Sequence, residues 1–178
     1  MAVQLNRGVD FPMVDLANIA YYPRIFDLAH RFFEDAWPHI CDVRYADLLL
    51  IRKTGFPVVH VESDFHAPLR YGDTITATIW IDAIGESSCT WCYEFHNQNR
   101  ELLWTSSQVT VCVNMESMKR QSIPEDLRQA LSQLTRAQEE WACSLIRSVW
   151  SYIIPTPIGL LLCGFFQVRK EAILYYTL

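Results

Sequence analysis

A stretch rich in β-branched and aromatic residues, 56–114, constrains the fold more than any other part of this sequence. Val, Ile, Thr, Trp and Tyr recur there in four runs, which are separated by clusters of Gly, Pro, Asn, Asp and Ser. The short turns favour an antiparallel meander of residues 56–67, 74–85, 89–97 and 102–114. A further strand is expected within residues 5–13, so the sequence predicts an antiparallel sheet of five or more strands.

One long amphipathic helix is predicted ahead of this stretch. Pro23 suits the first helical turn, and apolar residues recur at helical spacing from Phe26 until Trp37-Pro38 ends the pattern. No other early element could cover the apolar face of the sheet, so we expect an α+β domain in which one sheet wraps around one central helix. Two further segments are considered helical, a short helix or ordered connection at 41–54 and a closing helix within 125–146.

The overall charge restricts the expected partners. The 178 residues contain 15 Lys and Arg against 20 Asp and Glu, which gives a formal net charge of −5. Nucleic-acid-binding domains usually carry a basic patch, and this sequence has no Lys or Arg cluster. We therefore expect no nucleic acid, and favour a small molecule or another protein as the partner.

The cysteines indicate a reducing compartment. They are scattered through apolar segments, and residues 1–10 lack the apolar core of a signal peptide, so we expect free thiols and a cytoplasmic protein. Cys89 and Cys92 have the spacing of a metal or redox motif, but no second such pair exists, and residues three apart on a strand point to opposite faces. Neither a metal site nor a cofactor is predicted. The six cysteines are Cys41, Cys89, Cys92, Cys112, Cys143 and Cys163.

An isolated carboxylate, Asp15, lies seven positions before the Tyr22-Pro23 pair at which the long helix should begin. Asp15 alone could be an ordinary turn or capping residue, or a catalytic group. A helix that begins at Tyr22 would present unpaired backbone N–H groups and the positive end of its dipole. The competing carboxylates fall on the charged side of the helix, where a solvated surface is expected; they are Asp27, Glu34 and Asp35.

Two blocks of the sequence together resemble the hot-dog-fold acyl-CoA thioesterases of the 4-hydroxybenzoyl-CoA thioesterase type. The blocks are FPMVDLANIAYYPRIFDLAH at 11–30 and FPVVHVESDFHAPLRYGDTI at 56–75, and the resemblance covers roughly residues 4–130. It implies a hot-dog fold, in which the antiparallel sheet wraps around the long central helix. The expected organisation is a hot-dog thioesterase domain at 1–143, followed by an apolar C-terminal tail at 144–178 that lies outside the resemblance.

The resemblance also implies an activity, the hydrolysis of an acyl-CoA thioester to a free acid and CoA. Asp15 would act as nucleophile or general base, and the backbone N–H of Tyr22 would stabilise the oxyanion. Asn18 stands where the family commonly has Gly, which is tolerable because Asn visits left-handed backbone readily. The residues expected to bind the substrate are Asn18, Ile19, His60 and His66. For His60 and His66, the alternative is that each is an ordinary hydrogen-bonded histidine of a strand.

Assembly and the tail leave alternatives open. The family resemblance implies a homodimer or homotetramer with the active site between subunits. The alternative function is that of a non-catalytic hot-dog protein that binds an acyl ligand or serves in assembly.

Residues 148–168 carry no charge and are long enough to cross a bilayer. Pro155 and Pro157 interrupt that segment, so membrane association of the tail is not favoured. The sequence does not decide which acyl group is bound. It also leaves open which basic side chains bind the phosphates of CoA; the candidates are Arg52, Lys53, Arg70 and Arg100.

Overall fold

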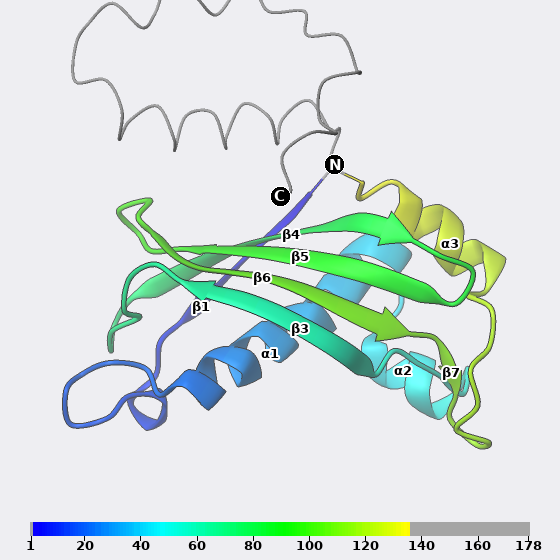
Figure 1. Cartoon of the computed structure of the whole chain (residues 1–178), viewed down its shortest axis with the longest axis horizontal. Helices are drawn as coiled ribbons and strands as arrows, with labels where there is room; N and C mark the ends of the chain where they lie inside the picture. Colours follow the sequence, from blue (N-terminus) through cyan, green and yellow to red (C-terminus); the bar gives the residue numbers. More distant parts are fainter. Residues whose placement is uncertain (1, 136–178) are drawn as a thin grey trace, which may run out of the picture. The chain divides into compact units, whose positions relative to one another are not determined.

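The structure is a computed structural model and describes residues 2–135. Its centre is a five-stranded antiparallel sheet with the strand order β1-β4-β5-β6-β3 (Figure 1). The strands are β1 (Val3–Gly8), β3 (Val58–Phe65), β4 (Thr74–Ile84), β5 (Ser88–His96) and β6 (Leu102–Val111). A two-stranded sheet pairs β2 (Thr54–Gly55) with β7 (Val113–Asn114).

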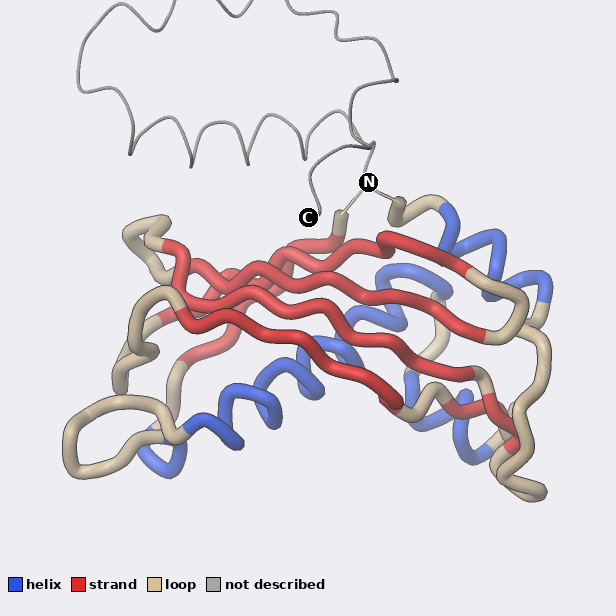
Figure 2. Tube along the Cα trace, viewed as in Figure 1, coloured by secondary structure: helices blue, strands red, loops and turns tan. Residues whose placement is uncertain are grey.

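The long helix α1 (Tyr22–Cys41) runs along one face of the five-stranded sheet, as Figures 1 and 2 show. The predicted arrangement of one sheet around one central helix is therefore confirmed. Three short helical segments complete the described chain, namely the 3-10 turn η1 (Phe11–Met13), α2 (Tyr45–Leu50) and α3 (Glu125–Ser132).

The predicted end of the long helix at Trp37-Pro38 is wrong, because α1 continues to Cys41 with Pro38 inside it. Proline removes one N–H donor, and this close to the end of the helix the loss affects only the last turns. Trp37 is fully buried, and its packing holds this part of the helix in place. The helix ends at Asp42, whose φ of 51° is left-handed.

The predicted meander is correct only for β4, β5 and β6. The strand β3 pairs with β6 instead of β4, because β1 occupies the other edge of β4, with Val3 opposite Ile79 and Gly8 opposite Thr74. Residues 66–73 therefore cross from one edge of the sheet to β4. Among the described residues, β3 has no strand partner on its outer side, so its backbone is a free edge.

The hydrophobic core lies between α1 and the inner face of the sheet. Small side chains at Ala29 and Ala36 let the helix backbone approach the strands, and both are buried. Aromatic rings fill the remaining space: the ring centroids of Phe32 and Phe95 are 5.2 Å apart, and those of Phe33 and Trp91 are 4.9 Å apart. Such edge-to-face pairs add to the stabilisation that apolar burial provides.

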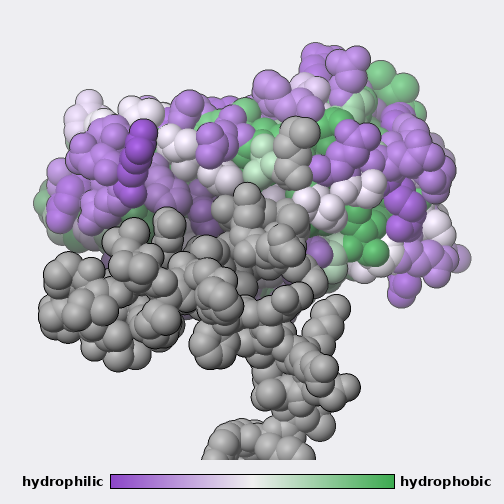
Figure 3. Space-filling model, turned by 90° about the horizontal axis from the view of Figure 1, so that it is seen from above, coloured by the Kyte–Doolittle hydropathy of each residue, from purple (hydrophilic) through white to green (hydrophobic). Residues whose placement is uncertain are grey.

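In the view of Figure 3, hydrophilic residues gather at both ends of the described part of the molecule, and apolar residues lie between them. Within residues 2–135, no helix is long and apolar enough to span a membrane. The predicted continuation of the closing helix beyond residue 135, the domain boundary at 143 and the apolar tail lie outside the described residues.

We predict that Phe32→Ala lowers the free energy of unfolding by about 3–5 kcal/mol, because it removes a fully buried ring between α1 and β5. Chemical denaturation of the purified protein measures this change. Arg31→Ala, one residue away on the exposed side of α1, should change stability by only about 0.5 kcal/mol or less. Equal losses in the two variants would show that the Phe32 contact is not part of a tightly packed core.

Candidate active site

A tight loop connects η1 to α1 and carries Asp15. The Asp15 N–H donates to the Ile19 carbonyl oxygen at 3.1 Å, and the Asn18 N–H donates to the Asp15 carbonyl oxygen at 3.0 Å. An antiparallel bridge between Val14 and Ala20 closes the base of the loop. These backbone contacts fix Asp15 just ahead of the helix start.

The Asp15 carboxylate takes part in its own loop. Its Oδ1 accepts the Ala17 N–H at 2.8 Å and the Ile19 N–H at 3.4 Å, which is the turn role that the sequence allows. Its Oδ2 makes no hydrogen bond to any residue of the described chain. The side chain is exposed, so one oxygen is held while the other is available to a ligand.

Asn18 links the two sequence blocks in space. Its φ of 57° is left-handed, which is the conformation that Asn tolerates best after Gly. Its side-chain Oδ1 accepts the Tyr71 N–H at 3.2 Å. The Ala20 N–H donates to the Leu69 carbonyl oxygen at 2.8 Å, so the Asp15 loop is attached to the segment that follows β3.

The start of α1 leaves one backbone donor unused. Pro23 has no N–H, and the Arg24 N–H donates to the Tyr21 carbonyl oxygen at 2.7 Å. The Tyr22 N–H finds no acceptor within residues 2–135. A free N–H at the positive end of a helix is a donor for an anion or a polarised carbonyl oxygen.

A hollow of about 330 Å³ opens beside this helix start. From the Asp15 loop and α1 it is lined by Ile19, Ala20, Tyr22 and Ile25, and from the end of β3 by residues 65–69. We call it the loop pocket. It brings Ile19, Tyr22 and His66 together, and the loop that carries Asp15 and Asn18 forms one of its walls.

His60 does not join this group. It lies near the start of β3, six positions before His66, and its Nε2 is 3.2 Å from Glu62 Oε1. Side chains alternate along a strand, so His60 is on the face turned away from α1. His66 does line the loop pocket, with its Nε2 3.0 Å from Thr105 Oγ1.

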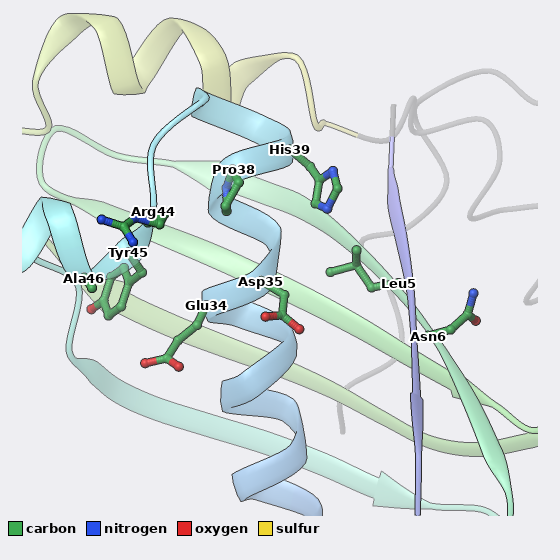
Figure 4. A pocket seen from close by; sticks show the side chains of 9 residues that line it. All are labelled: Leu5, Asn6, Glu34, Asp35, Pro38, His39, Arg44, Tyr45 and Ala46. Carbon is green, nitrogen blue, oxygen red and sulfur yellow. The ribbon is translucent and has the colours of Figure 1, made fainter.

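A larger hollow of about 490 Å³ lies over the outer side of α1, between β1 and α2 (Figure 4). Its carboxylates are engaged: Asp35 pairs with Arg7 at 2.6 Å, and Glu34 lies 3.4 Å from His30. Asp27, elsewhere on α1, pairs with Arg31 at 3.0 Å. The three competing helix carboxylates thus have partners on the surface of α1, and the smaller, more apolar loop pocket is the better candidate for chemistry.

The cysteines within residues 2–135 are free thiols in poor positions for chemistry. Burial raises the pKa of the Cys89 thiol to about 12 and that of the Cys92 thiol to about 11. The thiolate is the form that attacks or binds a metal, so both groups stay inactive at neutral pH. In this part of the chain, no group of three His, Cys, Asp or Glu side chains could hold a metal ion.

Sequence reasoning missed two apolar walls of the loop pocket. In the sequence, nothing distinguishes Ile25 from the other apolar residues of the long helix, and Phe65 is predicted only as part of a strand. Phe65 lies at the end of β3, directly after the alternating run and before His66-Ala67-Pro68, where a strand gives way to a loop. Residues at that transition often line sites, which is the one signal that could have indicated it.

Comparison with known proteins agrees with this geometry. The family model described as the thioesterase-like superfamily matches residues 7–131. The chain belongs to this superfamily. A 1,4-dihydroxy-2-naphthoyl-CoA hydrolase from Nostoc punctiforme is 24% identical over 141 residues, which cover 78% of this chain and 93% of that protein.

Solved structures share the hot-dog fold that the sequence predicted. A 1,4-dihydroxy-2-naphthoyl-CoA thioesterase from Synechocystis superposes with a TM-score of 0.67 at 20% identity, covering 77% of this chain and 100% of that one. A gentisyl-coenzyme A thioesterase gives a TM-score of 0.66 at 22% identity, covering 72% of this chain and 99% of the other. The predicted family and fold are therefore confirmed.

We predict that Asn18→Ala loosens the Asp15 loop, because a left-handed residue with a Cβ costs about 1–2 kcal/mol and the acceptor for the Tyr71 N–H is lost. Hydrogen exchange at the Ala17 and Ile19 amides should become roughly tenfold faster. Asn18→Gly keeps the backbone conformation and should have the smaller effect. If both variants exchanged equally fast, the left-handed backbone would not be what holds the loop.

Proposed function

We propose that the protein is an acyl-CoA thioesterase that hydrolyses a thioester to a free acid and CoA at the loop pocket. The observation that carries this proposal is that two groups near the start of α1 have no hydrogen-bond partner within the described residues. They are the N–H of Tyr22, which lines the loop pocket, and Oδ2 of Asp15, whose loop forms one wall of that pocket. Thioester hydrolysis needs both an oxyanion donor and a nucleophile or base. Membership of the thioesterase-like superfamily supports the same activity.

The reaction begins with the thioester carbonyl oxygen facing the Tyr22 N–H. Asp15 either attacks the carbonyl carbon itself or removes a proton from a water that attacks the carbonyl carbon. In both routes negative charge develops on the oxygen, where the N–H and the helix dipole stabilise it. The C–S bond then breaks, and CoA leaves as a thiolate that takes up a proton. With water as the nucleophile this step gives the free acid; with Asp15 as the nucleophile it gives a mixed anhydride, which water then opens to the free acid and the Asp15 carboxylate.

The substrate is a CoA thioester whose acyl group enters the apolar loop pocket. Asn18 and Ile19 shape the loop wall of this pocket, and His66 lies on the wall at the end of β3. His60 is too far along β3 to touch the same acyl group within one subunit. The named relatives act on aromatic acyl-CoAs, which makes an aromatic acyl group the first to test.

The second candidate function is a non-catalytic hot-dog protein that binds an acyl ligand or serves in assembly. The involvement of Asp15 Oδ1 in loop hydrogen bonds favours this reading, because it gives the carboxylate a structural role. The free Oδ2 and the free Tyr22 N–H favour the enzyme, since a purely structural turn has no use for them. A hydrolysis screen over aromatic, short-chain and long-chain acyl-CoAs separates the two functions.

We predict that Asp15→Asn lowers kcat/KM for the best acyl-CoA substrate on the order of 10²-fold or more, because the amide can neither attack the carbonyl nor take a proton from water. Release of the CoA thiol measures the rate. The melting temperature should stay close to that of the wild type, because Asn retains an oxygen that can accept the Ala17 N–H.

Asp27→Ala is the matched control, since it removes another carboxylate of the same region, one that is partly exposed and paired with Arg31. It should leave kcat/KM within about a factor of two. Near wild-type hydrolysis by a folded Asp15→Asn protein would return Asp15 to a purely structural role in its turn.

The proposed location is the cytoplasm.

The proposed assembly is a homodimer, and a homotetramer could be built from two such dimers. The free edge of β3 supports the homodimer, because four apolar side chains there are 42–61% exposed: Val58, Val59, Val61 and Phe65. A second copy that pairs antiparallel along this edge buries them and removes the edge. Antiparallel pairing also brings the start of the partner's β3 next to Phe65, beside the loop pocket.

We predict that Val61→Lys converts the dimer to a monomer, because it places a charge in the middle of the paired edges. Sedimentation velocity at micromolar concentration measures the change. Asn99→Lys adds the same charge in the β5–β6 turn, away from the edge, and should leave the dimer intact. A wild-type protein that sediments as a folded, active monomer would contradict the proposed assembly.

A further inference from the structure

The edge strand β3 carries a row of ionisable side chains on one face (Figure 1). From His60 to Phe65 its pairing with β6 is regular, so every second side chain points to the same side of the sheet. The side turned away from α1 carries His60, Glu62 and Asp64, and all three are exposed. We call these three residues the edge row. His60 Nε2 lies 3.2 Å from Glu62 Oε1, so neighbouring members of the edge row interact within one subunit.

The neighbouring strand β6 places no charged side chain beside the edge row. In the register of β3 and β6, the members of the edge row lie opposite Val109, Ser107 and Thr105, none of which ionises at neutral pH. The next strand, β5, adds the carboxylate of Glu94 opposite Thr105. His66 follows the edge row, with its Nε2 3.0 Å from Thr105 Oγ1. The histidines of β3 and of the residues just after it are therefore the groups that can offset the negative charge at this edge.

Pairing with a second copy brings the two edge rows side by side. A homodimer has a twofold axis, and an axis perpendicular to the joined sheet turns the outer face of one copy onto the outer face of the other. Directly opposed residues of an antiparallel pair point to the same face. In every register that pairs the middle of β3, each member of the edge row therefore lies opposite a residue of the same face of the partner.

Charge and strand length select one of these registers. Only shifts by two residues keep the faces matched, since a shift by one turns every side chain to the other face. With Glu62 on the twofold axis, His60 of each copy lies opposite the partner's Asp64. A shift one way places Glu62 of each copy opposite the partner's Asp64, and like charges directly opposed are unfavourable. A shift the other way leaves Phe65 opposite the partner's Pro57, which precedes β3.

We propose that the edge row makes the homodimer pH-dependent, with protonated His60 of each copy pairing with the partner's Asp64. This inference rests on the proposed function and its homodimer, and adds the regulation of that assembly. With neutral histidines, each edge row carries the two negative charges of Glu62 and Asp64, and the two edge rows repel each other.

Acidification reverses the balance of charge at the joined edges. Histidine is the side chain that gains a proton as the pH falls from about 8 to about 5. A protonated His60 lies between Glu62 of its own chain and the partner's Asp64, so it offsets negative charge from both copies. Protons then bind more tightly to the dimer than to the monomer, and by linkage association becomes stronger as the pH falls and weaker as it rises.

The test is sedimentation velocity over a range of protein concentrations, which gives the Kd of the dimer at about pH 8 and about pH 6 in low salt. In the wild type the Kd should fall about fivefold on acidification, because two exposed ion pairs form and each has a modest effect. His60→Gln should remove most of this change. Sodium chloride at about 0.5 M should reduce it in the wild type, because salt screens exposed charges.

His30→Gln is the matched control. His30 lies on α1 with its Nε2 3.4 Å from Glu34 Oε1, and its side chain is 56% exposed against 59% for His60. This variant should keep the full pH dependence. Glu62→Gln should tighten the dimer at about pH 8, because it removes the two like charges that meet on the twofold axis.

The possible failures are distinguishable. A dimer with the same Kd at both pH values would overturn the inference, and so would a His60→Gln protein that retains the whole change. A wild type that is monomeric at every pH would refute the proposed assembly and this inference with it. Absence of hydrolysis for every acyl-CoA, in a protein whose dimer responds to pH as expected, would refute the proposed catalysis alone.

Discussion

The contact between α1 and the inner face of the sheet is the interaction on which the other features depend. Phe32 and Phe33 meet Phe95 and Trp91 along the middle of the helix, while Ala29 lets its backbone come close. Rings packed this densely leave the helix little freedom to slide or turn. The N-terminus of α1 is therefore held at a fixed place beside the end of β3, and a catalytic donor needs such a position.

The second constraint is the attachment of the Asp15 loop to the segment after β3. Two hydrogen bonds connect chain segments about 50 residues apart: the Ala20 N–H reaches the Leu69 carbonyl oxygen, and the Tyr71 N–H reaches Asn18 Oδ1. They hold the two sequence blocks next to each other in the folded chain. One block supplies the carboxylate and the helix start, and the other supplies the opposite wall of the loop pocket.

The free edge of β3 affects both assembly and substrate access. Phe65 is at once an exposed edge residue, a wall of the loop pocket and the cross-strand neighbour of Trp104. A partner subunit along this edge would change the surroundings of Phe65, and therefore the space offered to an acyl group. The proposed assembly would therefore act on the loop pocket through one side chain.

The sequence by itself determined the strands, the long helix and the family, because alternation, helical spacing and the two blocks are local patterns. It also predicts Asp15 and Tyr22 as catalytic residues and His66 as a substrate-binding residue, and these roles stay predictions. It did not determine that α1 continues past Pro38, since burial of Trp37 outweighs a missing hydrogen bond.

Only the tertiary structure decided what depends on residues far apart in the chain. β3 pairs with β6 because β1 takes the edge of β4, and no local pattern records that competition. The same holds for the separation of His60 from the loop pocket, and for the difference between Trp91 and Trp104. Each is a strand tryptophan in the sequence, but Thr110 accepts a hydrogen bond from the indole N–H of Trp91, whereas no described residue accepts one from that of Trp104.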